Sequence, residues 1–127
     1  MGKPKVLIIE DNADLLGILR QLLSTEYDVS TARRGEEGVA LAVSVRPDVV
    51  ILDLQLPCMS GMEAGRWIKR EVGPVPILVL TALTDPAATE AVMRSGCCDS
   101  FMSKPASLHS IRSRVAELMG SGSGARE

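Results

Sequence analysis

The amino-acid sequence predicts an α/β fold, a doubly wound parallel sheet of five strands with five helices. Short apolar runs rich in Val, Ile and Leu alternate with amphipathic helical patterns along the 127 residues. This alternation is typical of parallel strands joined by helical crossovers. The central apolar runs are continuous, as in strands that are buried on both faces. Right-handed crossovers then place helices on both sides of the sheet.

Three of the expected strands have strong signals and two have weak ones. The strong runs cover residues 5–10, 48–53 and 76–81, where most positions are apolar. The weaker runs at residues 28–31 and 100–103 are shorter and more polar. Short, partly polar runs of this kind are typical of the edges of a sheet.

Five helical patterns fill the intervals between these strands and follow the last one. Asn12 or Asp14 is expected to cap the first helix, whose apolar stripe is Leu15, Leu16, Leu19, Leu22 and Leu23. The others are bounded by proline, glycine or capping residues. They span residues 34–45, 60–72 and 85–96 and a segment that begins at Ser107.

Composition and charge exclude several classes of function. Fourteen basic and sixteen acidic residues give a net charge of −2, whereas a general nucleic-acid-binding surface carries a basic stripe. No apolar run approaches the ~20 residues that span a bilayer. We therefore expect neither membrane insertion nor direct nucleic-acid binding by this domain. Three cysteines beside a single histidine suit free thiols in a reducing compartment, which predicts a cytoplasmic location.

The chain is expected to form one domain followed by a short tail. A length of 127 residues suits a single core. The Gly-Ser repeat that begins at Gly120 has the composition of a flexible chain. We therefore place the domain at residues 1–119 and a flexible tail or linker at 120–127.

Polar side chains follow the carboxyl ends of four expected strands. Glu10 and Asp11 follow the first, Asp53 ends the third, Thr81 ends the fourth and Lys104 follows the fifth. Because ligands of open parallel sheets bind beyond these ends, we expect the five side chains to converge on one rim. Three carboxylates there repel each other unless a cation lies among them, and hard oxygen ligands suit Mg²⁺. With an ammonium and a hydroxyl, the set suits a phosphoryl group that an Asp carboxylate receives.

From Pro4 to Met119 the chain resembles the receiver domain of two-component response regulators. The resemblance rests on Glu10-Asp11, the segment DLQLPCMSG that begins at Asp53, Thr81-Ala82, Phe101 and Lys104-Pro105, in this order and spacing. It implies a flavodoxin-like three-layer sandwich with strand order 2-1-3-4-5. It also implies that Asp53 takes a phosphoryl group from a histidine kinase or a histidine phosphotransfer protein.

The resemblance also implies a magnesium site. Asp11, Asp53 and the backbone carbonyl of Gln55 would bind Mg²⁺ directly, and Glu10 would act mainly through water. Gln55 stands where the family often has Met. Its side chain either reaches the phosphoryl site or points into solvent.

A conformational switch is the third implication of the resemblance. Lys104 would pair with the phosphoryl oxygens, and its bond to Pro105 would be cis. Thr81 would move toward the phosphoryl group and Phe101 would move inward, which changes the surface formed by the fourth helix, fifth strand and fifth helix. Such a domain is a signalling switch with limited self-catalysed phosphorylation and dephosphorylation, not an enzyme.

Three other functions compete with this interpretation. A haloacid-dehalogenase-like phosphatase also uses an Asp nucleophile and Mg²⁺, but it needs a second Asp where Gln55 stands. A flavodoxin-like nucleotide module needs a Ser/Thr/Gly-rich phosphate loop, and the loop after the first strand is acidic. The third is a receiver-like domain that signals without phosphate. The sequence leaves open an output domain or effector beyond the tail, and a homodimer that depends on phosphorylation.

Overall fold

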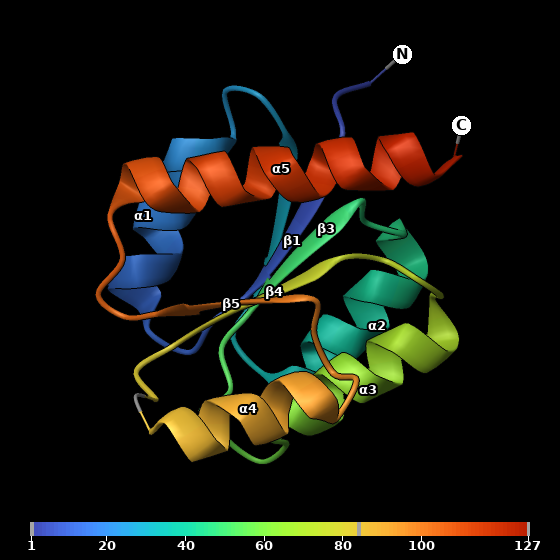
Figure 1. Cartoon of the computed structure of the whole chain (residues 1–127). Coiled ribbons are helices and arrows are strands. Elements are labelled where there is room, and N and C mark those ends of the chain that lie inside the picture. The colour runs from blue at the N-terminus through green and yellow to red at the C-terminus, as the bar shows by residue number, and fades with distance from the viewer. Residues whose placement is uncertain (1, 84, 127) are drawn as a thin grey trace.

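The five apolar runs form one parallel sheet. The computed structural model describes residues 2–83 and 85–126, with side chains described as far as Gly120. The strands are β1 (Lys5–Ile9), β2 (Asp28–Ala32), β3 (Val49–Leu52), β4 (Ile77–Thr81) and β5 (Ser100–Ser103). Their order is β2-β1-β3-β4-β5 and each neighbouring pair is parallel, which confirms the expected topology (Figure 1).

Helices cover both faces of this sheet and complete a three-layer sandwich. One face is covered by α1 (Ala13–Leu23) and α5 (Leu108–Arg126). The other face is covered by α2 (Gly35–Val45), α3 (Gly61–Glu71) and α4 (Pro86–Arg94) (Figure 1). The predicted flavodoxin-like arrangement of five strands and five helices is therefore confirmed.

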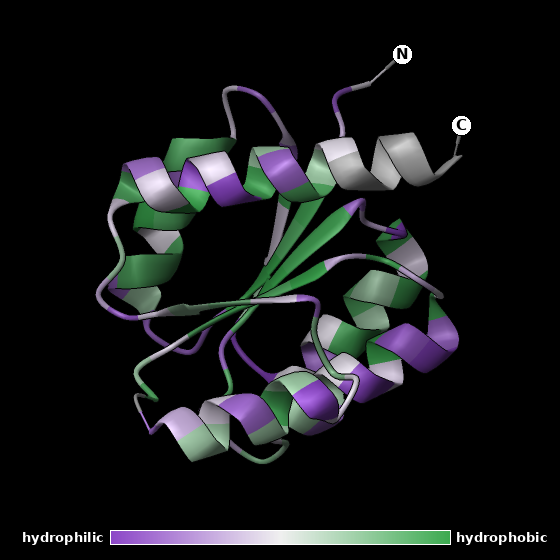
Figure 2. Cartoon of the chain, viewed as in Figure 1, coloured by the Kyte–Doolittle hydropathy of each residue, from purple (hydrophilic) through white to green (hydrophobic). Residues whose placement is uncertain are grey.

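The continuous apolar runs are explained by burial on two sides. Successive side chains of a strand point to opposite faces, so Val49 and Ile51 pack with α1 and α5. Val50 and Leu52 pack with the other three helices. All four residues of β3 are buried, and the central strands β1, β3 and β4 are almost uniformly hydrophobic (Figure 2).

Four helices begin at a polar side chain that caps them, which in α5 is the hydroxyl of Ser107. The Asn12 side chain accepts hydrogen bonds from the backbone N–H groups of Asp14 and Leu15. Ser60 caps α3, and Asp85 caps α4 ahead of a proline in its first turn. Such caps satisfy N–H groups that have no partner within the helix. Of the two expected caps for the first helix, the structure selects Asn12.

Gly65 allows α3 to approach the segment between α4 and β5. A Cβ at this position would lie 2.4 Å from the carbonyl oxygen of Cys97 and 3.1 Å from its Cβ. Cys97 and Cys98 are both buried free thiols, so they act as small packing residues. Close packing therefore explains a glycine in the middle of a helix.

The expectations about membrane insertion and about the C-terminal tail are tested to different extents by the structure. In the part of the chain that is described, no helix is long and apolar enough to cross a membrane. Residue 127 and the side chains of residues 121–126 lie outside the description. The expected domain boundary at 119 and the flexible tail at 120–127 therefore stay predictions.

Candidate functional site

Strand register brings the predicted site residues to one edge of the sheet. Ile9 of β1 pairs with Ala32 on one side and with Leu52 on the other. Beyond these pairs the backbone ladder continues for one more residue. The N–H of Glu10 donates to Ala32 (3.0 Å), and the N–H of Asp53 donates to Ile9 (3.0 Å). Both acidic residues therefore lie directly above the carboxyl ends of neighbouring strands.

The fifth strand delivers a lysine to the same edge. The backbone N–H of Lys104 donates to the carbonyl of Thr81 at 2.7 Å, which fixes the end of β5 against the end of β4. The bond from Lys104 to Pro105 is cis, as the resemblance implied. Glu10, Asp53, Thr81 and Lys104 thus come from four strands that lie side by side in the sheet.

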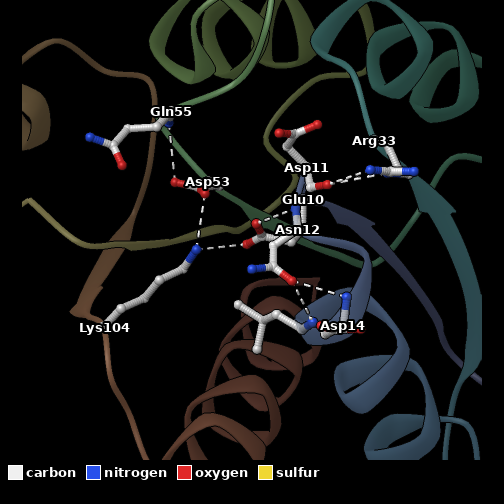
Figure 3. A network of polar contacts seen from close by, with 9 residues as sticks. Glu10, Asp11, Asn12, Asp14, Arg33, Asp53, Gln55 and Lys104 are labelled. Carbon is white, nitrogen blue, oxygen red and sulfur yellow. Dashed lines mark hydrogen bonds and ion pairs between the residues drawn. The ribbon is translucent and has the colours of Figure 1, made fainter.

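Lys104 joins two buried carboxylates (Figure 3). Its Nζ lies 2.9 Å from Oε1 of Glu10 and 3.0 Å from Oδ2 of Asp53. Glu10 is 3% exposed and Asp53 is 5% exposed. Buried charges are stable only when they are paired and hydrogen-bonded, and a single ammonium pairs with two carboxylates here. The pair of carboxylates therefore retains an excess of negative charge.

Burial and charge shift the pKa values of this network. Burial is the largest influence on Glu10 and raises the pKa of its carboxyl group, although hydrogen bonds from Lys104 and Asn12 oppose it. Burial by itself would lower the pKa of Lys104, but the hydrogen bonds to Glu10 and Asp53 outweigh it and raise that pKa. Lys104 is therefore held in its cationic form.

Backbone N–H groups orient the second oxygen of each carboxylate. Oδ1 of Asp53 accepts from the N–H of Gln55 at 3.1 Å, and Oε2 of Glu10 accepts from the N–H of Asn12 at 3.0 Å. The Gln55 side chain is exposed. Gly61 lets the loop after β3 fold back closely, because a Cβ there would lie 2.2 Å from the carbonyl oxygen of Asp53. Both carboxylates are thus fixed before any ligand binds.

Thr81 has a polar atom with no partner. The residue is 0% exposed, and its hydroxyl is the one buried side-chain polar atom without a hydrogen bond within the described residues. A buried hydroxyl that makes no hydrogen bond is costly. Thr81 ends β4 beside β3, and Asp53 follows β3. An incoming oxygen at this rim would satisfy the hydroxyl.

Asp11 does not join the other two carboxylates. Its side chain is exposed, and Figure 3 shows the carboxylate pointing away from Lys104. Over the described ranges, no group of three or more His, Cys, Asp or Glu side chains is arranged to hold a metal ion. The expected convergence of Glu10, Asp11 and Asp53 is therefore wrong for this arrangement. Asp11 lies in the bend after β1, where Arg33 donates two hydrogen bonds to its backbone carbonyl oxygen.

The chemistry of the site nevertheless fits a divalent cation. The two buried carboxylates of Glu10 and Asp53 share the single ammonium of Lys104, which leaves negative charge at this rim for a bound cation to balance. All the nearby ligands are oxygen atoms, which Mg²⁺ prefers. The orphaned hydroxyl of Thr81 additionally fits an oxygen-rich ligand such as a phosphoryl group.

Phe101 lies on β5. It pairs with Val79 of β4 and packs half-buried against the core on the side of α2, α3 and α4. Sequence reasoning missed the contact between Arg33 and Asp11. An arginine at the start of an exposed loop gives no signal that distinguishes it from a solvated side chain.

Comparisons with known proteins agree with this geometry. The family described as response regulator receiver domain matches residues 6–116. The chain is 37% identical over 119 residues to the sensor histidine kinase TmoS of Ectopseudomonas mendocina, covering 92% of this chain and 12% of that protein. It is 32% identical over 118 residues to the polar-differentiation response regulator DivK of Brucella anthropi, covering 91% of this chain and 95% of that protein.

Solved structures give the same result. The receiver domain of a LuxO repressor protein from Vibrio parahaemolyticus superposes with a TM-score of 0.90 at 25% identity, over 98% of this chain and 95% of that one. The BeF3-activated receiver domain of DrrB gives 0.85 at 26% identity, over 93% and 98%. Since the family match covers most of the chain, the chain belongs to the response regulator receiver domain family of two-component signalling.

Proposed function

We propose that Asp53 is the phosphoacceptor of this receiver and that Mg²⁺ is its cofactor. The observation that carries the proposal is the contact at 3.0 Å between Lys104 Nζ and Oδ2 of the buried Asp53, beside a Thr81 hydroxyl without a partner. Together they offer a nucleophile, a cation and a hydrogen-bond donor for one phosphoryl group.

The reaction transfers a phosphoryl group from a phosphohistidine to Asp53. An oxygen of the Asp53 carboxylate attacks phosphorus, the P–N bond to the donor histidine breaks, and the imidazole leaves with the bonding electron pair. The ammonium of Lys104 stabilises negative charge on the phosphoryl oxygens. The hydroxyl of Thr81 donates to one of those oxygens and so gains the partner it lacks.

Asp11, Asp53 and the backbone carbonyl of Gln55 would hold Mg²⁺, with Glu10 acting through water. The cation supplies positive charge that neutralises the phosphoryl oxygens. Asp11 must turn its carboxylate toward Asp53 to take part, because that side chain points away in the structure (Figure 3).

The donor is a histidine kinase or a histidine phosphotransfer protein. An apolar hollow of about 420 Å³ opens beside Lys104 and is lined in part by Leu15, Pro105 and Ile111. This hollow offers an apolar surface next to Lys104, which contacts the acceptor Asp53, and such a surface suits a helix that presents a phosphohistidine. The relative from Ectopseudomonas mendocina is itself a sensor histidine kinase, which supports a partner of this class.

Phosphorylation would switch the surface of α4, β5 and α5. Thr81 ends β4, and Phe101 is half-buried on the neighbouring β5. A move of Thr81 toward the phosphoryl group would free space for Phe101. An output domain or effector, or a second copy of the chain, would read that surface. Self-catalysed phosphorylation from small donors and slow hydrolysis belong to the same proposal, as does a cytoplasmic location.

A dehalogenase-like phosphatase is not supported by the site. Gln55 stands where such enzymes have a second aspartate, and its side chain is exposed. An amide at that position cannot serve as the general acid or base that a phosphatase requires.

Labelling with a small phosphodonor tests the proposal. Wild type, Asp53→Asn and Asp14→Asn are incubated with acetyl phosphate and Mg²⁺ and analysed by intact mass spectrometry. Asp14 provides a matched control, because it is an exposed aspartate in the first turn of α1. We expect one phosphoryl group on wild type and on Asp14→Asn, none on Asp53→Asn, and none when the metal is chelated. Labelling of Asp53→Asn, or no labelling of wild type, would overturn the assignment.

A further inference from the structure

Arg33 reaches across the rim of the sheet to the loop that follows β1. It is the first residue after β2, and its Nε and Nη2 atoms lie 3.2 and 3.0 Å from the backbone carbonyl oxygen of Asp11. Figure 3 shows the guanidinium facing this carbonyl. Two N–H groups of one planar fork thus donate to a single peptide oxygen, which restricts that peptide more than a single donor would.

The base of the Arg33 side chain is fixed by the sheet. Ala32 pairs with Ile9 and accepts the N–H of Glu10 at 3.0 Å, so the register of the two strands sets the backbone of Arg33 beside that of Asp11. The N–H of Arg33 itself donates to Oε1 of Glu37 at 3.2 Å. The guanidinium therefore extends from an anchored backbone.

We propose that Arg33 is a positioning residue for the magnesium site. By holding the Asp11 peptide, it would fix the point from which the Asp11 carboxylate turns toward the metal. This inference rests on the proposed function, since Asp11 is a ligand only if the domain binds Mg²⁺. Arg33 would touch neither the phosphoryl group nor the metal and would act through Asp11.

The charge of Arg33 and its positioning role predict opposite changes in Mg²⁺ affinity when Arg33 is removed. The guanidinium is a cation close to the proposed metal, so charge alone would oppose binding of Mg²⁺. Loss of that charge would therefore tighten Mg²⁺ binding. Loss of the fork from the Asp11 carbonyl would weaken it, because partners that orient a metal ligand contribute to affinity.

The neighbouring arginine offers a matched control. Arg34 is exposed and carries the same charge one residue further along the loop. Its side chain makes no hydrogen bond or ion pair that involves the described residues. Arg34→Ala therefore removes an equivalent charge and leaves the Asp11 peptide in place.

Calorimetric titration with MgCl₂ tests the inference without any phosphodonor. We expect half-saturation of Arg33→Ala at a Mg²⁺ concentration roughly tenfold above that of wild type, the lower end of the effect of residues that orient metal ligands. Arg33→Lys keeps the charge and one donor group, so its half-saturation is expected at a Mg²⁺ concentration between those of wild type and Arg33→Ala. Arg34→Ala is expected to bind as tightly as wild type or more tightly. Circular dichroism verifies that each variant is folded. If Arg33→Ala or Arg33→Lys does not fold, Arg33→Gln replaces it, and its half-saturation is also expected at a higher Mg²⁺ concentration than that of wild type.

The outcomes separate this inference from the proposed function. If wild type binds Mg²⁺ and is phosphorylated while Arg33→Ala binds Mg²⁺ equally or more tightly, only the role of Arg33 is overturned. Equal weakening in Arg33→Ala and Arg34→Ala would also overturn it. A wild-type protein that neither binds Mg²⁺ nor accepts a phosphoryl group would overturn both proposals.

Discussion

Replacement of Thr81 by valine should stabilise the unphosphorylated domain and impair its response to phosphate. The side chain is 0% exposed, and its hydroxyl makes no hydrogen bond within the described residues. Valine has nearly the same shape and replaces the hydroxyl with a methyl group. The substitution therefore removes an unsatisfied polar atom and leaves the packing around it almost unchanged.

The magnitude follows from the cost of a buried donor without a partner. Such a group costs about 1–3 kcal/mol of desolvation free energy. We expect Thr81→Val to raise the free energy of unfolding by about 1–2 kcal/mol. For a domain of this size each kcal/mol raises the Tm by roughly 3–5 °C.

Urea unfolding of wild type, Thr81→Val and Thr31→Val measures this difference. Thr31 is a half-buried threonine on the edge strand β2, and its replacement should change the unfolding free energy by less than about 0.5 kcal/mol. A Thr81→Val protein that is less stable than wild type would refute the reasoning, because the hydroxyl would then have a partner.

The same variant should respond weakly to a phosphate mimic. Beryllofluoride with Mg²⁺ would give the wild-type hydroxyl an acceptor and so recover the cost of its burial. The mimic should therefore stabilise wild type more than Thr81→Val, by an amount close to the difference between the two proteins without it. Equal stabilisation of both proteins would show that the hydroxyl does not contact the bound group.

Three further predictions follow from packing, charge and exposure. Gly65→Ala should lower the free energy of unfolding, measured in urea, by about 1–3 kcal/mol, because its Cβ would lie 2.4 Å from a carbonyl oxygen. At Gly17 a Cβ has open space, so Gly17→Ala should raise that free energy by up to about 1 kcal/mol. The reverse order of the two variants would contradict the packing around Gly65. Lys104 has a raised pKa in the folded state, so its contribution to stability is complete below pH 10.5 and is lost as the pH rises through the folded pKa. Denaturant midpoints should therefore fall less steeply above pH 10.5 in Lys104→Met than in wild type, and parallel curves would count against the ion pairs. A thiol reagent at neutral pH should modify the exposed Cys58 alone in the native protein and all three cysteines after unfolding; rapid reaction of a second native thiol would disprove the burial of the other two.

Most of the fold could be predicted from local patterns. The run at residues 100–103 became β5 with the same bounds, although it is only half-buried. The other strands shifted by a residue at their ends. Glu10 and Asp53, which the sequence placed in strands, are the first residues after β1 and β3, although both remain buried.

The candidate site could be predicted only as a set of residues. The positions of Glu10, Asp53, Thr81 and Lys104 at strand ends follow from the order of the strands along the chain. The direction of the Asp11 side chain did not follow, and the contact of Arg33 with Asp11 joins residues 22 positions apart. Such contacts depend on which strands are neighbours and on how loops close above them.

The sequence by itself determined the fold class, the family and the identity of the charged residues, since hydrophobic periodicity and motif spacing are local properties of the chain. The tertiary structure alone decided that one ammonium joins Glu10 and Asp53, that the Thr81 hydroxyl is left without a partner, and that Arg33 holds the Asp11 peptide. Each of these depends on which polar groups from different parts of the chain lie within about 3 Å of one another. Register and side-chain direction set such distances, and no local pattern in a sequence encodes them.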